Sequence, residues 1–192
     1  MTEHTVKANE FLRLTLRRFV HHPEGGGRGR MTTELTERFE TFADEGDWLT
    51  ARRTGIGSTD APALLGLSSY KGPLGVYHDK RQTLAPDLSE REWLFWGRAL
   101  ERPIGERYRT ETGRRVAFPT APYHLVRMEG HPELVASCDA MLADDARSGP
   151  GVLEIKNVGF YVGLDWEEEA PLQFQVQLQH QLMVTGCRWG GL

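Results

Sequence analysis

Two acidic residues and one lysine have the types and spacing of a hydrolytic metal site. Asp139 lies in the apolar segment 135–142, and Glu154 and Lys156 lie in the apolar segment 152–156. Neighbouring carboxylates repel each other, and a divalent cation relieves that repulsion. Oxygen ligands without paired His or Cys favour Mg²⁺ or Mn²⁺ over zinc. A lysine beside the cation can orient water or stabilise developing charge, so the pattern points to phosphodiester hydrolysis.

The two apolar segments are predicted to pair as a β-hairpin, because the polar stretch between them ends in Gly-Pro-Gly. Side chains alternate across a strand, so Glu154 and Lys156 are expected on one face and Leu153 and Ile155 on the other. Asp139 is expected on the matching face of the first strand. An exposed Glu-x-Lys strand with an aspartate nearby is the alternative interpretation, and it needs no metal.

Length and composition favour one α/β domain, with 192 residues, 39% hydrophobic and 26% charged. The net charge of −4 does not by itself indicate a nucleic-acid partner. Residues 52–115 hold twelve basic and eight acidic residues, net +4, whereas residues 129–170 hold two basic and ten acidic ones, net −8. A basic half beside an acidic half fits a metal-dependent nuclease that holds backbone phosphates, and it also fits ordinary surface variation.

The remaining composition excludes several classes. Cys138 and Cys187 are the only cysteines, which argues against a disulfide framework, a structural zinc site and a four-cysteine iron–sulfur cluster. We expect a reducing, cytoplasmic location and no membrane partner, because the sequence has no signal peptide and no membrane-spanning apolar run. Residues 1–30 are expected to be a flexible N-terminal tail, and residues 31–192 the folded domain.

Two helices are predicted in the first half of the domain. One covers 32–51, and the other begins near Pro62, capped by Ser58, Thr59 or Asp60. A helix start preceded by glycines and an arginine can hold a phosphate, although a plain capped helix explains the same residues.

A longer helix is predicted from the capping box at 89–92, with Pro103 kinking or restarting it and Gly113 ending it. Glu101 lies at the edge of its apolar stripe, where a carboxylate needs a metal or a basic neighbour. The expected buried stripe comprises Trp93, Trp96, Gly97, Leu100, Ile104 and Tyr108.

Residues 173–184 alternate like a strand, but Pro171, the segment length and the glutamines favour a helix. On such a helix Gln177 could reach a site one layer away. Residues 114–128 are expected to form strand and turn, and residues 187–192 the opening of another strand.

Five short motifs occur in order along the chain. They are Arg53-x-Gly-Ile-Gly-Ser-x-Asp60, Trp96-Gly-x-x-Leu-Glu101, Ser137-x-Asp139, Leu153-Glu-Ile-Lys156 and Pro171-x-x-Phe-x-x-Gln177-x-Gln179-x-x-Leu-x-Val-Thr-Gly186. Together, from about Trp48 to the C-terminus, they resemble the phage lambda exonuclease and YqaJ-like viral recombinase nucleases of the PD-(D/E)XK superfamily. The resemblance implies an α/β, restriction-endonuclease-like fold, a mixed sheet flanked by helices, with its C-terminal part apparently truncated.

The resemblance also implies site residues. Glu101, Asp139, Glu154 and the carbonyl of Ile155 would hold Mg²⁺, with Mn²⁺ as the alternative. The implied role of Lys156 is to position or activate water, and that of Gln177 is to support the site. Arg53 and the turn of Ser58, Thr59 and Asp60 would bind the DNA end, at its 5′ phosphate.

By the same resemblance, the chain is a phage- or prophage-encoded 5′-to-3′ exonuclease of homologous recombination, acting on double-stranded DNA ends in a bacterial host. A single-strand annealing protein is its expected partner, and a homo-oligomeric ring its expected assembly. Two positions depart from the family pattern: Ala140 replaces the usual glycine, and Phe174 replaces a common tyrosine.

Two alternative functions stay open on the sequence. One is an endonuclease or helicase-associated repair nuclease of the same superfamily. The other is an inactive, truncated DNA-binding relic, although the presence of the three predicted acids and of Lys156 argues against decay of the site.

Overall fold

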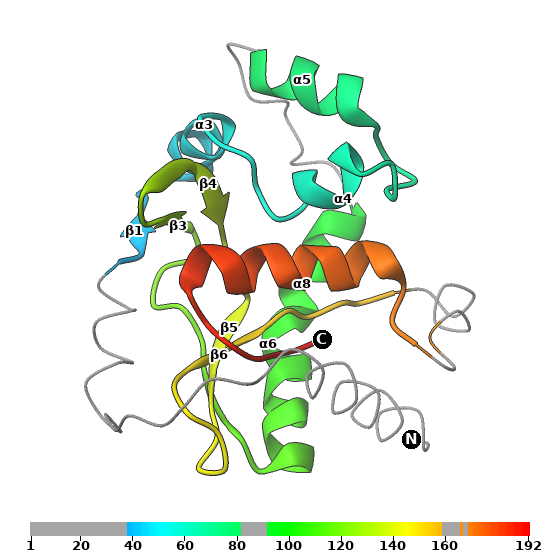
Figure 1. The fold of residues 1–192 in the computed structure, drawn as a ribbon. Coiled ribbons are helices and arrows are strands. Elements are labelled where there is room, and N and C mark those ends of the chain that lie inside the picture. Colours follow the sequence, from blue (N-terminus) through cyan, green and yellow to red (C-terminus); the bar gives the residue numbers. More distant parts are fainter. Residues whose placement is uncertain (1–37, 82–91, 159–165, 167–168) are drawn as a thin grey trace.

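The computed structural model describes residues 38–81, 92–158, 166 and 169–192. These residues form a mixed α/β fold of two sheets flanked by helices, which confirms the predicted fold class (Figure 1). The first sheet is antiparallel, in the order β1 (Glu40–Thr41), β3 (His124–Met128) and β4 (His131–Ala136). The second is mixed, in the order β2 (Arg115–Ala117), β5 (Ala140–Ala143), β6 (Gly151–Leu153) and β7 (Gly190–Gly191). In it β7 runs parallel to β6, as expected for the opening of another strand.

Five helices accompany the two sheets in the described part of the chain. They are α3 (Glu45–Arg53), α4 (Asp60–Leu64), α5 (Pro73–Arg81), α6 (Glu92–Thr112) and α8 (Leu172–Thr185). None of these described helices has the length and apolar character needed to cross a bilayer.

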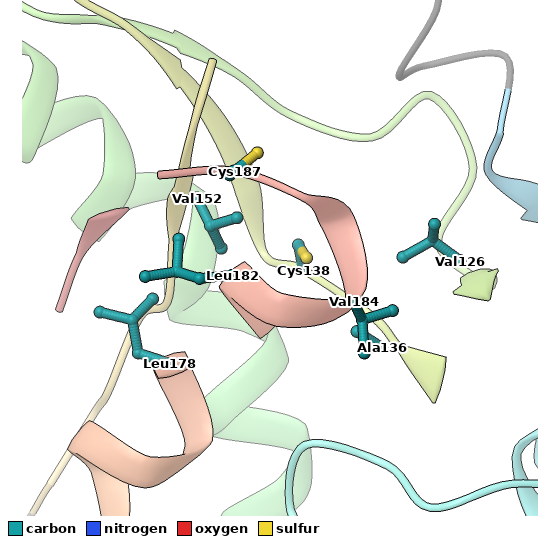
Figure 2. Close-up of a cluster of buried hydrophobic side chains, with 8 residues drawn as sticks. All are labelled: Val126, Ala136, Cys138, Val152, Leu178, Leu182, Val184 and Cys187. Carbon is teal, nitrogen blue, oxygen red and sulfur yellow. The ribbon is translucent and has the colours of Figure 1, made fainter. Parts of the chain in front are cut away.

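Helix α8 confirms the helical prediction for the glutamine-rich segment. Pro171 immediately precedes it, and Gly186 ends it in the left-handed conformation at φ 76°, which glycine adopts at little cost. In Figure 1 α8 crosses in front of the strands while α6 runs behind them. Leu178 and Leu182 of α8 pack into a buried cluster with Val126 and Val152 of the two sheets (Figure 2). This helix therefore joins both sheets.

The two faces of β6 pack against different helices. Val152 contributes to the cluster beneath α8, whereas Leu153 and Ile155 belong to a second cluster that includes Ile104 and Tyr108 of α6. The predicted alternation along this strand is confirmed, and it directs Glu154, two residues after Val152, toward α8.

The prediction of one continuous strand over 135–142 is wrong. The chain leaves β4 after Ala136 and enters β5 at Ala140, so Ser137, Cys138 and Asp139 lie in a break between the two sheets. β4 pairs with β3, whereas β5 pairs with β2 and β6. Cys138 and Met141 contact the same core cluster although they are three residues apart, which an unbroken strand does not allow.

Three helix predictions need correction. The first helix begins only at Glu45, where the Asp44 side chain accepts a hydrogen bond from Asp47 N, and β1 precedes it. Helix α6 runs through Pro103, so it does not restart there, which was one of the two alternatives predicted. Trp96 of the same helix, expected to be buried, is 50% exposed. Helix α5 was not predicted. The tail at 1–30 and the capping residues at 89–91 lie outside the described residues.

Gly105 sets the distance between α6 and the second sheet. A Cβ at this position would lie 2.7 Å from Phe118 Cζ and 3.2 Å from Ile155 Cδ1, whereas a Cβ at Gly97 of the same helix meets nothing within 4 Å. The bare backbone at Gly105 therefore lets α6, which carries Glu101 one turn earlier, approach Ile155.

We expect Gly105→Ala to destabilise the protein by about 1–3 kcal/mol, because the added methyl overfills this contact. Gly97→Ala is the matched control, and it should stabilise α6 by about 0.5–1 kcal/mol. Urea unfolding curves followed by circular dichroism measure both changes. Equal effects of the two substitutions would contradict the packing described.

Candidate active site

The open end of the β5–β6 hairpin brings Asp139 and Glu154 together. Ala140 pairs with Leu153, so the residues just beyond this pair, Asp139 and Glu154, stand opposite each other. Ile155 N donates a hydrogen bond of 2.6 Å to Asp139 Oδ2. The hairpin register thus fixes two carboxylates at one place.

Glu154 is a buried carboxylate, 3% exposed, with donors on both oxygens. Lys156 Nζ and Gln177 Nε2 each lie 2.5 Å from Oε1. Gln181 Nε2 donates to Oε2 at 2.6 Å. The predicted approach of Gln177 from the neighbouring helix is therefore present in the structure.

Lys156 lies between Glu154 and the first turn of α8. Its ammonium is 5.2 Å from the centre of the Phe174 ring, in a cation–π contact. The Phe174 ring therefore has a contact at the site without needing a hydroxyl. It holds the ammonium beside Glu154.

Glu101 of α6 approaches the pair from the opposite layer. Burial, followed by the charge of Glu154, raises the pKa of Glu101, while Arg98 and Lys156 oppose the rise. Burial and then the charge of Glu154 also raise the pKa of Asp139 well above its ordinary value, and Glu101 adds to this rise. Three acids therefore share one region of excess negative charge.

The donor chemistry of this region fits a hard divalent cation. Carboxylate oxygens and a nearby backbone carbonyl are the ligands that Mg²⁺ and Mn²⁺ prefer. Within the described ranges, no three His, Cys, Asp or Glu side chains stand close enough to form a ready-made metal site. Lys156 and Gln177 occupy Glu154 Oε1 instead. The three-acid metal site stays a prediction.

Asp60, one of the residues in the predicted DNA-binding turn, has a structural role that does not require DNA. Asp60 is buried, and its carboxylate accepts hydrogen bonds from Gly57 N at 2.9 Å and from Lys71 Nζ at 2.9 Å. Lys80 Nζ lies 2.6 Å from Asp60 Oδ2, the oxygen that also accepts from Gly57 N, whereas Lys71 binds Oδ1. Asp60 therefore ties α4 to α5. Ser58 is also buried, and Thr59 is exposed.

Arg52, the neighbour of the predicted DNA-binding Arg53, interacts with two of the buried acids. Its guanidinium stacks 4.6 Å from the centre of the Trp48 ring, and it interacts electrostatically with Asp60 and Glu154. Burial lowers the pKa of Arg52, and Asp60 opposes that shift. The four-residue spacing of Trp48 and Arg52, which places both on one helix face, is the sequence signal for this pair.

Comparison with known protein families covers the part of the chain that contains these site residues. A family model described as "YqaJ-like viral recombinase domain" matches residues 47–188. The chain belongs to this family. The match includes Glu101, Asp139, Glu154, Lys156 and Gln177.

A curated YqaJ-family relative supports the assignment. It is the protein YqaJ of Bacillus subtilis (strain 168), 33% identical over 156 residues. The aligned region covers 79% of this chain but only 45% of that protein, so the chain spans less than half of the relative's length.

Asp139→Asn should raise the melting temperature of the metal-free protein at neutral pH. The folded state raises the pKa of Asp139, so it binds this proton more tightly than the unfolded state does. The stabilisation from Asp139 is therefore present below its ordinary pKa and is lost as pH rises through the raised value. Each kcal/mol of repulsion removed corresponds to about 2–4 °C.

Scanning calorimetry in EDTA checks this expectation, and the gain should shrink as pH falls toward about 4, the ordinary Asp pKa. Asp145→Asn is the control, because the Asp145 side chain is 94% exposed. A lower melting temperature for Asp139→Asn at neutral pH would contradict a raised pKa of Asp139 in the folded state.

Proposed function

We propose that the chain is a Mg²⁺-dependent deoxyribonuclease that digests one strand of double-stranded DNA from the 5′ end during phage-type recombination. The observation that carries the proposal is the grouping at the hairpin end. There Lys156 Nζ lies 2.5 Å from the buried Glu154, with Asp139 opposite. Two acids beside one ammonium suit a reaction in which a phosphodiester gains negative charge.

Asp139 and Glu154 would hold the cation, with Glu101 and the carbonyl of Ile155 completing its protein ligands. A bound divalent cation supplies Lewis acidity and offsets the charge of the phosphate. Burial, followed by the charge of Glu154, raises the pKa values of Asp139 and Glu101. Both causes disfavour the charged carboxylates, and a bound cation would offset them, which supports this assignment.

Lys156 and Gln177 would act on water and on the phosphate oxygens. Both side chains donate to Glu154 Oε1, which positions two polar donors beside the acid pair. The Lys156 ammonium would orient the attacking water and stabilise charge that develops on the phosphate. Gln177 supplies a neutral donor that restrains the same carboxylate.

Positive side chains near the acids support DNA as the substrate. Arg52 and Arg98 both interact electrostatically with the acid group, and Arg52 lies at the end of α3, beside Arg53. Guanidinium groups bind backbone phosphates without reading sequence. An annealing partner belongs to the same proposal, because a single-stranded product is the substrate of strand annealing. A homo-oligomeric ring around the DNA is the assembly proposed with it.

The purified protein should digest linear duplex DNA in Mg²⁺ and leave closed circular duplex intact. Separate 5′ and 3′ end labels distinguish the polarity, and we expect early release of the 5′ label. EDTA should abolish digestion. Cutting of the closed circle would instead identify an endonuclease, and no digestion of any substrate would support an inactive DNA-binding protein.

Lys156→Ala should lower turnover by about 10²-fold or more, because a preorganised charge stabiliser is lost. DNA binding, measured by fluorescence anisotropy in EDTA, should largely persist. Arg109→Ala is the control, since Arg109 lies on the far part of α6 in an exposed pair with Glu106. Digestion by Lys156→Ala at the wild-type rate would count against the assignment.

A further inference from the structure

Gln181 makes a pair of hydrogen bonds that the catalytic assignment leaves unexplained. It lies on α8 one turn after Gln177 and is 0% exposed. Its Nε2 donates to Glu154 Oε2 at 2.6 Å and to Ser137 O at 3.0 Å. One side-chain nitrogen therefore uses both of its hydrogens to connect two separate segments.

These two segments are the ones that carry the acid pair. Glu154 follows β6, and Ser137 stands two residues before Asp139 in the break between β4 and β5. No regular strand pairing holds the break itself, so its position depends on other contacts. The Gln181 amide is a direct link between this break and the Glu154 carboxylate.

The break is held at further points. Ser137 Oγ donates to His124 O at 2.7 Å, and Trp48 Nε1 donates to the same carbonyl at 2.9 Å. His124 Nε2 lies 2.9 Å from Cys138 O. Gln181 is thus anchored to a restrained backbone, and it can hold Glu154 against the repulsion of Asp139.

The remaining atom of the amide argues against a purely structural role. Gln181 Oε1 is buried and has no hydrogen-bond partner among the described residues. A buried acceptor without a partner reduces stability, so an amide is a poor choice here for packing alone. What the amide provides is the pair of donors to Ser137 and Glu154.

We propose that Gln181 is a positioning residue that fixes Glu154 through Oε2 and thereby sets its separation from Asp139. Oε1, which accepts from Lys156 and Gln177 in this structure, would then bind the divalent cation once Lys156 is displaced from it. The catalytic consequence of this inference rests on the proposed function. The expected effect of Gln181 on cation binding is argued from the hydrogen bonds of this chain alone.

Gln181→Met tests the proposal, because methionine keeps the side-chain length and removes both donors. We expect Mn²⁺ to bind the DNA-free protein about 10–100-fold more weakly, as for other residues that orient metal ligands. Free Mn²⁺ counted by electron paramagnetic resonance gives the affinity. The kcat at saturating DNA and fixed Mg²⁺ should fall, with KM for DNA little changed.

Gln179→Met is the matched control, because Gln179 lies on the same helix and is exposed. It should leave both readouts unchanged. Gln181→Met in a Glu154→Gln background should cause no further loss of Mn²⁺ affinity, because Gln181 acts through Glu154. A full additional loss in that background would overturn the proposal.

Gln181→Asn keeps the test decisive if the methionine variant does not fold. Asparagine retains the amide but is one methylene shorter, so it cannot span Ser137 O and Glu154 Oε2 together, and weaker Mn²⁺ binding is expected. Folded Gln181 variants that bind Mn²⁺ like the wild type would refute the positioning role. A wild-type protein that binds Mn²⁺ but never cleaves DNA would refute the proposed function instead.

Discussion

The repulsion between Asp139 and Glu154 is the constraint on which the rest of the site depends. The hairpin register places these two carboxylates opposite each other, and burial removes the water that would otherwise screen them. Every donor around them opposes that repulsion. Ile155 N binds Asp139, while Lys156, Gln177 and Gln181 bind Glu154. The fold holds an arrangement that its own electrostatics disfavour, which is typical of a functional site.

The layered fold explains how donors and acids reach one point. Alternation along β6 turns Val152 and Glu154 toward α8, and it turns Leu153 and Ile155 toward α6. Apolar residues on both faces fix the strand between the two helices, so Glu154 has little freedom to move. The amides of α8 then arrive from one side and Glu101 of α6 from the other. A single strand with two packed faces therefore organises the site.

Much of this arrangement could be predicted from the sequence, because local rules decide it. Alternation predicted the faces of 152–156, and Pro171, the segment length and the glutamines predicted helix α8 in spite of its strand-like pattern. The break at 137–139 could not be predicted, since it depends on β4 and β5 pairing with different partners. The tertiary contacts of Asp60 and Gln181 could not be predicted either, because they join segments that lie far apart in the sequence. Both residues are identified only by distant donors or acceptors.

A crystal structure with Mn²⁺, located by its anomalous scattering, tests the central claim most directly. We expect one peak within ligand distance of Asp139 and of Glu154 Oε1, with Lys156 displaced from that oxygen and Gln181 still bound to Oε2. A peak elsewhere, with Lys156 and Gln177 both still on Glu154, would contradict it.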